Sequence, residues 1–165
     1  MPRQIDNQNY LLGKPAKFAS SLSDGAAAVV IVSDKVVENK KLKPLARIIG
    51  HVSYAASPLY FTKAPIYAIQ KLLKKTDVNI DDIDLFEINE AFSCVTMAAV
   101  DELNISSDRV NVNGGAVSMG HPIGASGTRI LVTLINALKA RNLKYGIASL
   151  CIGGGEASAM LIEVL

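Results

Sequence analysis

Short apolar runs alternate with segments of helical periodicity along most of this chain, and that alternation limits the possible folds more than any other feature. The strand-like runs cover residues 26–32, 45–54, 83–88, 145–152 and 157–164, and another begins at Val110. A tight Gly-Gly-Gly turn joins the last two runs and favours an antiparallel pair, whereas runs separated by helices favour parallel neighbours. We therefore predict a layered α/β domain with a largely parallel sheet.

Helices are predicted between these runs. Pro65 suits the first turn of one helix, whose apolar residues recur at helical spacing. Asn89 is predicted to be the N-cap of a second helix, with Glu90 in its first turn. A third helix carries its apolar side on Ile130, Leu131, Leu134, Ile135 and Leu138. Residues 34–43 are polar and are expected to form a helix or a loop.

Composition and charge exclude several classes of protein. Half of the 165 residues are apolar, enough to bury a core, and the net charge of +2 comes with no basic face, so nucleic acid is not an expected partner. The apolar runs are short and the polar start lacks a signal-peptide core, which predicts no membrane association and a cytoplasmic location. Cys94 and Cys151 lack disulfide or metal spacing, so no metal is expected. Cys94 is expected in the core, and His51 is expected to be structural.

Three reactive or polar residues each follow a predicted strand, namely Asn89, His121 and Cys151. In α/β sheets ligands gather beyond the carboxyl ends of strands, where helix N-termini also point. We therefore expect these three side chains to lie at one edge of the sheet.

Each of them sits in a motif with both a functional and a structural interpretation. His121 lies in a loop with five glycines over residues 113–127, where an imidazole can act as a base, although such a loop can also be a simple turn. Cys151 precedes three glycines whose N–H groups can bind an oxyanion, although a cysteine ending an apolar strand is often an inert small side chain. Asn89 is the first residue of the motif Asn-Glu-Ala-Phe, and a role as a helix N-cap would also explain its presence there.

Together these motifs resemble the thiolase family. Gly-His-Pro-Ile-Gly-Ala-Ser-Gly at residues 120–127, Cys-Ile-Gly-Gly-Gly at 151–155 and Asn-Glu-Ala-Phe at 89–92 match its signatures, and residues 19–28 are similar to its Ser-rich stretch before a strand. Phe18 and Ser21 depart from that stretch. The resemblance implies a thiolase-like layered α/β/α fold with a C-terminal βαβαβαββ domain and a mixed five-stranded sheet. It divides the chain into a linker or cut end (1–17), the last strand of a preceding half (18–43) and the C-terminal domain (44–165).

The resemblance also implies residue roles in a reversible Claisen condensation of acyl-CoA thioesters. His121 would activate a nucleophile, Cys151 would move the proton at C2 of acetyl-CoA, Asn89 would hold a catalytic water, and the Gly153 N–H would stabilise an oxyanion. Coenzyme A contacts would come from Ser20, Phe92 and Phe61. Coenzyme A thioesters are expected as substrates, with no tightly bound cofactor. The segment around Phe61 is closest to the acetoacetyl-CoA branch.

The nucleophilic cysteine of the family stands in a Cys-X-Ser context that these 165 residues do not contain. The leading hypothesis is therefore the acid/base part of an acetyl-CoA C-acetyltransferase, inactive by itself. A non-catalytic thiolase-fold remnant or interaction module, and a 3-ketoacyl-CoA thiolase of longer chain specificity, stay as alternatives. Removing the first half would expose apolar surface, so we expect the chain to bind an N-terminal thiolase half or to self-associate, and a homo-oligomer is the expected assembly.

Overall fold

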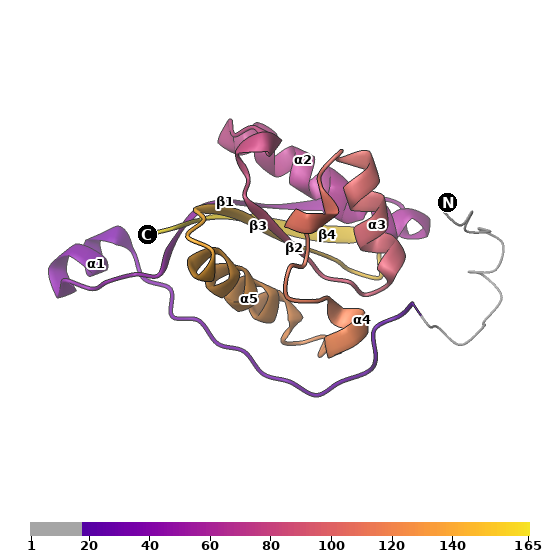
Figure 1. The fold of residues 1–165 in the computed structure, drawn as a ribbon, viewed down its shortest axis with the longest axis horizontal. Coiled ribbons are helices and arrows are strands. Elements are labelled where there is room, and N and C mark those ends of the chain that lie inside the picture. The colour runs from indigo at the N-terminus through magenta and orange to yellow at the C-terminus, as the bar shows by residue number, and fades with distance from the viewer. Residues whose placement is uncertain (1–17) are drawn as a thin grey trace.

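A mixed four-stranded sheet with helices on both faces forms the body of the computed structural model, which describes residues 18–165 (Figure 1). The strands are β1 (Ala46–Ala55), β2 (Leu85–Ile88), β3 (Tyr145–Cys151) and β4 (Glu156–Val164), in the order β1-β4-β3-β2. β2 and β3 are parallel, and β4 is antiparallel to both of its neighbours. The layered α/β class and the mixed sheet are thus confirmed, but the sheet has four strands rather than five and only one parallel pair. The linker expected at residues 1–17 lies outside the described residues.

Two helical layers enclose the sheet. α2 (Ala64–Thr76) and α3 (Ser93–Glu102) cover one face, and α4 (Ala116–Met119) and α5 (Ser126–Ala140) lie on the other (Figure 1). Each layer buries its own apolar cluster, one around Ile66, Leu72 and Ile147 and the other around Ile130, Leu134 and Ile162. Pro65 lies in the first turn of α2 as predicted, and the apolar stripe predicted for the third helix faces the sheet from α5. Among the described residues, every helix is too short or too polar to span a membrane.

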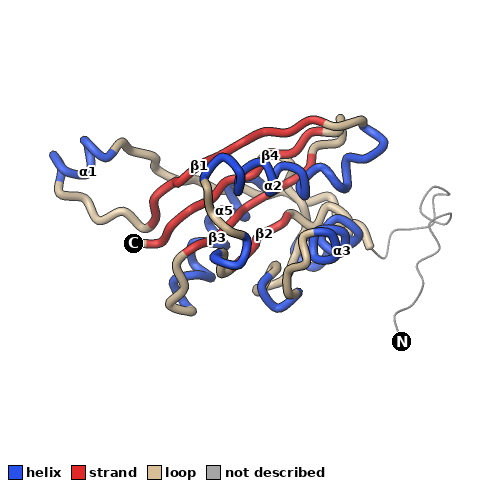
Figure 2. Tube along the Cα trace, turned by 90° about the horizontal axis from the view of Figure 1, so that it is seen from above, coloured by secondary structure: helices blue, strands red, loops and turns tan. Residues whose placement is uncertain are grey.

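The connections carry short helices as well. η3 (Ile80–Asp82) and η4 (Ser107–Arg109) are single turns of 3₁₀ helix, and η2 (Pro58–Lys63) is a longer 3₁₀ segment with a kink at Tyr60. α1 (Asp34–Lys40) forms in the polar stretch where either a helix or a loop was expected, and its C-cap is Lys41, which adopts a left-handed conformation (φ 49°). In the view from above, α1 lies at the end of the molecule away from α3 (Figure 2).

The fifth strand, predicted to begin at Val110, is reduced to one bridge between Val110 and Phe86. The next residue, Asn111, takes a left-handed conformation (φ 49°), which turns the chain away from the sheet. Its side-chain amide then bonds both backbone groups of Ile88, with distances of 2.9 Å to the N–H and 2.8 Å to the carbonyl. A side chain therefore satisfies the edge of β2 where a fifth strand would have continued.

The strand predicted at residues 26–32 is also absent. The run is extended, but it pairs with none of the four strands, and Val30 is 92% exposed and Ile31 70% exposed. A strand buried on both faces needs neighbouring strands and covering helices, and this run has neither in the described residues. It passes along the α5 side of the molecule on its way to α1 (Figure 1).

Candidate active site

The His121 ring is held at both of its nitrogens. Nδ1 lies 2.6 Å from Oγ of Ser126, the first residue of α5, and that hydroxyl donates its hydrogen to the Pro122 carbonyl oxygen at 3.0 Å. Because the hydroxyl has no second hydrogen to give, it accepts from Nδ1–H, and Nε2 keeps its lone pair. Nε2 lies 3.3 Å from Nδ2 of Asn89, which donates to it.

The surroundings of His121 favour the neutral ring. Burial, with a contribution from the positive charge of Arg129, lowers the pKa of His121 below its ordinary value of 6.5. The imidazole is therefore uncharged at neutral pH, and the nitrogen that faces Asn89 can accept a proton. This is the arrangement that a general base requires.

Asn89 is placed by the sheet rather than by a helix. Its N–H donates to the Ser149 carbonyl at 2.9 Å, which extends the pairing of β2 with β3 by one residue. The prediction that Asn89 caps a helix is wrong, since α3 begins at Ser93 with Phe92 as its N-cap. Backbone bonds from residues 18–20 to Ala91 and Ser93 flank Phe92, which is extended, so the helix starts only at Ser93 and the Asn89 amide reaches His121 instead of capping it.

Cys151 ends β3 opposite Ala157 of β4, and its side chain packs in the apolar cluster under α2 and α3. Burial, with a smaller effect of the nearby Cys94 thiol, raises the pKa of Cys151 above its ordinary value of 9.0. The thiol is therefore protonated at neutral pH. Because β2 and β3 are parallel neighbours, Asn89, which follows β2, and Cys151, which ends β3, lie at the same edge of the sheet. Among the described residues, Cys151 makes no direct hydrogen bond to His121 or Asn89.

The glycine turn after Cys151 combines one constrained position with one open position. Gly155 has φ of 101°, and an added Cβ would collide with the Ala56 carbonyl oxygen. Gly153 is exposed, and no atom lies within 4 Å of the place where its Cβ would be. The hydrogen bonds inside the turn use the N–H groups of Ile152 and Gly155. The turn is thus fixed at its end, and Gly153 faces open space where a ligand could approach.

Ser20, Phe92 and Phe61 come together from three separate segments. Both the N–H and the hydroxyl of Ser20 donate to the Ala91 carbonyl, at 2.9 and 3.0 Å. Ala19 forms a bridge with Phe92, whose ring meets the Phe61 ring edge to face at a centroid distance of 6.0 Å. The three residues named from the resemblance are therefore neighbours next to Asn89.

The segment from Ser20 to Gly25 also braces the histidine loop. The His121 N–H donates to the Ser21 carbonyl at 3.1 Å. Gly120 has φ of 91°, and an added Cβ there would strike the Ser23 side chain. Ser21, one of the departures from the family stretch, thus serves the loop through its backbone, which any residue provides.

Two acidic residues of this region have surroundings that the sequence did not predict, and Glu90 lies before α3 rather than in the first turn of a helix. Glu90 accepts the N–H of Val117 at 3.1 Å, which ties the start of α4 to the Asn89 segment. Glu87 lies in β2, is 2% exposed, and has a carboxylate oxygen, Oε1, without a hydrogen-bond partner. Burial raises the pKa of Glu87 to about 7, against the opposing charges of Arg129 and Arg141. Its position inside the apolar run Leu-Phe-Glu-Ile was the signal available in the sequence.

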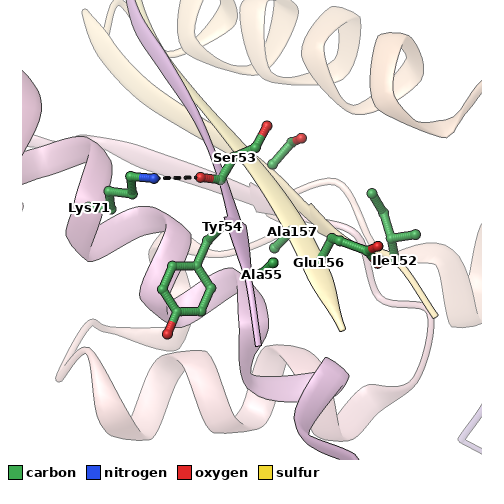
Figure 3. Close-up of a pocket in the computed structure, with 8 residues that line it drawn as sticks. Ser53, Tyr54, Ala55, Lys71, Ile152, Glu156 and Ala157 are labelled. Carbon is green, nitrogen blue, oxygen red and sulfur yellow. Dashed lines mark hydrogen bonds between the residues drawn. The ribbon is translucent and has the colours of Figure 1, made fainter. Parts of the chain in front are cut away.

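A cavity of about 580 Å³ opens beside the Cys151 turn (Figure 3). Its lining residues are Ser53, Tyr54, Ala55, Lys71, Ile152, Glu156, Ala157 and Ser158. Lys71 donates to the Ser53 carbonyl at 2.9 Å. Neither His121 nor Asn89 lines this cavity, so the hollow and the paired polar side chains do not coincide.

Comparison with known proteins places these motifs in context. The family described as "Thiolase, C-terminal domain" matches residues 42–164. A probable acetyl-CoA acetyltransferase of Dictyostelium discoideum is 50% identical over 147 residues, which are 89% of this chain and 36% of that protein. The chain therefore spans about a third of the length of such relatives.

Solved structures of related proteins are similar to this chain as well. The crystal structure of the Bacillus anthracis acetyl-CoA acetyltransferase has a TM-score of 0.87 and 48% identity, over 89% of this chain and 37% of that one. Human mitochondrial 3-ketoacyl-CoA thiolase in complex with CoA has a TM-score of 0.88 and 40% identity, over 90% of this chain and 38% of that one. At such identities the resemblance extends to sequence as well as to fold.

Proposed function

This chain belongs to the thiolase family, and we propose that it supplies the acid/base part of an acetyl-CoA C-acetyltransferase. The reaction would be the reversible Claisen condensation of two acetyl-CoA molecules to acetoacetyl-CoA and CoA. The observation that carries this proposal is the His121 ring, whose Nδ1 is committed to Ser126 and whose unprotonated Nε2 accepts from Asn89. In this proposal residues 44–165 are the C-terminal domain and residues 18–43 are the end of a preceding half.

His121 would act first, as a general base. Its Nε2 would take the proton from a cysteine thiol supplied by the preceding half, and the resulting thiolate would attack the carbonyl of acetyl-CoA. The CoA thiolate that leaves would take that proton back from Nε2 of His121. The lowered pKa of His121 supports this role, because a base that is already neutral does not have to lose a proton before it acts.

Cys151 would act second, at C2 of another acetyl-CoA. Its thiolate would remove a proton from C2, and the carbanion would attack the acyl group held by the nucleophile, whose thioester bond breaks to release the cysteine as a thiolate. In the thiolysis direction its thiol would return that proton. The raised pKa of Cys151 supports the thiolysis role at neutral pH, since the thiol then holds its proton.

Two oxyanion sites would stabilise the negative charge that develops on carbonyl oxygens. One would combine a water held by Asn89 with His121, whose Nε2 can donate once it has taken the thiol proton, and the other would use the N–H of Gly153. The open space beside Gly153 and the direct bond between Asn89 and His121 support this division.

Coenzyme A would lie across the aromatic pair of Phe61 and Phe92, with Ser20 beside it. Their adjacency supports this proposal, as does the CoA complex of the human relative. CoA thioesters would be substrates that come and go, with no tightly bound cofactor.

Inactivity of the isolated chain follows from the same proposal. These 165 residues contain no Cys-X-Ser, so the nucleophile would have to come from another polypeptide or another segment. The exposed side chains of Val30 and Ile31 support a partner surface, either the N-terminal half or a second copy of this chain. A homo-oligomer is the assembly we propose for the complete protein.

A longer acyl chain is the second candidate, favoured by the 40% identity to human 3-ketoacyl-CoA thiolase. Identities of 48 and 50% to acetyl-CoA acetyltransferases favour the short chain. A non-catalytic remnant would predict no activity in any assembly, although the bonded set of His121, Asn89 and Ser126 supports catalysis.

A chimera tests the proposed function. Residues 18–165 would replace the matching C-terminal part of the Bacillus anthracis acetyl-CoA acetyltransferase, and thiolysis of acetoacetyl-CoA and of 3-ketooctanoyl-CoA would be measured. We expect thiolysis of acetoacetyl-CoA that His121→Asn abolishes. A folded chimera without thiolysis of either substrate would overturn the proposal, and a preference for 3-ketooctanoyl-CoA would select the second candidate.

A further inference from the structure

β1 lies at one edge of the sheet and presents an open row of backbone groups there. It is the longest strand, with 10 residues, and within residues 18–165 only β4 pairs with it. The Ala56 N–H donates to the Gly155 carbonyl at 2.9 Å, at the end of this pairing. In an antiparallel pair every second residue bonds the partner strand, so Val52 and Tyr54 direct their backbone groups toward β4.

The residues that alternate with these, His51, Ser53 and Ala55, direct their N–H and carbonyl groups outward. An open row of this kind is a template for another strand, and a long edge leads to association between sheets unless something protects it. The other edge strand, β2, has only 4 residues, and the Asn111 side chain bonds its end. The edge of β1 is therefore the greater liability of the two.

Two lysines of α2 bond the outward carbonyls. Lys71 Nζ donates to the Ser53 carbonyl at 2.9 Å (Figure 3), and Lys75 Nζ donates to the His51 carbonyl at 3.0 Å. Residues four apart in a helix are about 6 Å apart along its axis, and alternate residues of a strand are about 7 Å apart. Because these spacings nearly match, one side of α2 can bond two successive outward carbonyls.

A bulge in β1 lets α2 come close to this edge. The register of β1 with β4 shifts between Ile48 and Gly50. At Gly50 an added Cβ would lie 2.6 Å from Cγ2 of Thr76 and 3.5 Å from Cδ1 of Leu72, so a side chain there would push α2 away. The bulge also interrupts regular pairing just before the carbonyls that the lysines bond. A strand added to β1 would therefore meet an irregular segment and then two ammonium groups.

We propose that Lys71 and Lys75 close the outer edge of β1 and prevent it from pairing with β1 of a second copy of this chain. An incoming strand would have to displace both ammonium groups to bond the outward carbonyls, and a symmetric pair would break these bonds in both copies. The lysines of the two copies would also meet along one seam, where like charges repel. This block on strand addition is separate from the exposed apolar surface at Val30 and Ile31.

Replacement of both lysines by methionine tests the proposal on the whole chain. Lys71→Met with Lys75→Met keeps much of the side-chain length but removes the donors and the charge. Lys74→Met with Lys139→Met is the matched control, because both residues are exposed on helices, change the net charge equally and, in the described residues, do not bond β1. Lys71→Arg with Lys75→Arg keeps donors and charge and should associate no more than the parent chain.

Sedimentation equilibrium measures self-association, and amide hydrogen exchange followed by NMR locates it. We expect the methionine pair to lower the dissociation constant for self-association at least about 10-fold relative to the control. The outward N–H groups of His51, Ser53 and Ala55 should then exchange more slowly as the protein concentration rises. Each single methionine substitution should give a smaller shift in the same direction, and the singles decide the question if the double variant does not fold.

Equal dissociation constants for the folded methionine pair and its control would overturn the proposal. Stronger association in which the three outward N–H groups still exchange freely would also overturn it, because the new contact would then lie elsewhere on the chain. Stronger association together with slowed exchange at those groups, absent from the arginine pair, would establish that the lysines close the edge.

Discussion

The loop that carries His121 and the turn that carries Cys151 are positioned by different kinds of contact. The imidazole is bonded through both ring nitrogens, and its backbone is bonded to Ser21. The Cys151 thiol is held by apolar packing, and the only strict demand in its turn is the conformation of Gly155. A base must present one particular nitrogen, which requires hydrogen bonds, whereas the thiol that gives its proton in thiolysis stays protonated mainly through the absence of water and charge.

Removing either reactive group should have the largest effect. In the chimera, we expect His121→Asn and Cys151→Ala each to reduce kcat/KM for acetoacetyl-CoA thiolysis by about 10³-fold, since a general acid or base contributes roughly that much. Circular dichroism should show a native fold in both variants. If only one of the two substitutions reduced kcat/KM, the other residue would have no role in the chemistry. The comparison between the His121 loop and the Cys151 turn would then fail.

The two glycines of the Cys151 turn should respond differently. Gly155→Ala forces a side chain into a left-handed conformation and onto the Ala56 carbonyl, so we expect a loss of about 3 kcal/mol in the free energy of unfolding. Gly153→Ala, the matched control in open space, should change stability by less than about 1 kcal/mol. Urea unfolding measures both values. Equal losses would show that the turn is not fixed at Gly155.

Freeing the imidazole should have an intermediate effect. Ser126→Ala removes the acceptor for Nδ1–H, and we expect kcat/KM to fall by about 10- to 100-fold, as for other residues that orient a functional histidine. Thr128→Ala, a hydroxyl deletion two residues along the same helix, is the control and should keep its activity. If Ser126→Ala were as active as the parent chimera, hydrogen bonding would not be what positions the ring.

The smallest effect concerns the pH dependence of thiolysis. The pKa of His121 is lowered, so its neutral form persists below 6.5, and the pKa of Cys151 is raised, so its thiol persists above 9.0. Thiolysis needs both forms, and kcat/KM of the chimera should therefore be flat between these values, with an acid limb below 6.5 and an alkaline limb above 9.0. An optimum confined within that range would contradict the surroundings assigned to one of the two groups.

The periodicity of apolar residues predicted most of the fold, because each helix and strand buries the side on which those residues recur. The stripe on α5 and the apolar runs of β3 and β4 are examples, since each packs as its pattern indicates. Residues 26–32 show the limit of such a pattern. A run of apolar residues indicates that the segment favours burial, but it does not indicate whether neighbouring strands are present to bury it. Val110 began a strand that Asn111 ends after one bridge, because its side chain takes over the edge of β2.

The candidate site was predicted in its residues but not in its contacts. The resemblance of the motifs singled out Asn89 and His121. Sequence preferences for helix N-caps, in contrast, wrongly predicted that Asn89 caps a helix, because they do not include the bonds from residues 18–20 next to which α3 begins later. Glu87 was missed for a related reason. A single acidic residue in an apolar run has no periodicity of its own, and the burial that raises the pKa of Glu87 arises only in the folded sheet.

The most direct test of the central claim is thiolysis of acetoacetyl-CoA by this 165-residue chain, measured alone and mixed with the separately expressed remainder of the Bacillus anthracis acetyl-CoA acetyltransferase. We predict no thiolysis by either part alone and measurable thiolysis in the mixture, lost when the chain carries Cys151→Ala. Thiolysis by the chain alone would contradict the claim that it holds the acid/base groups without the nucleophile.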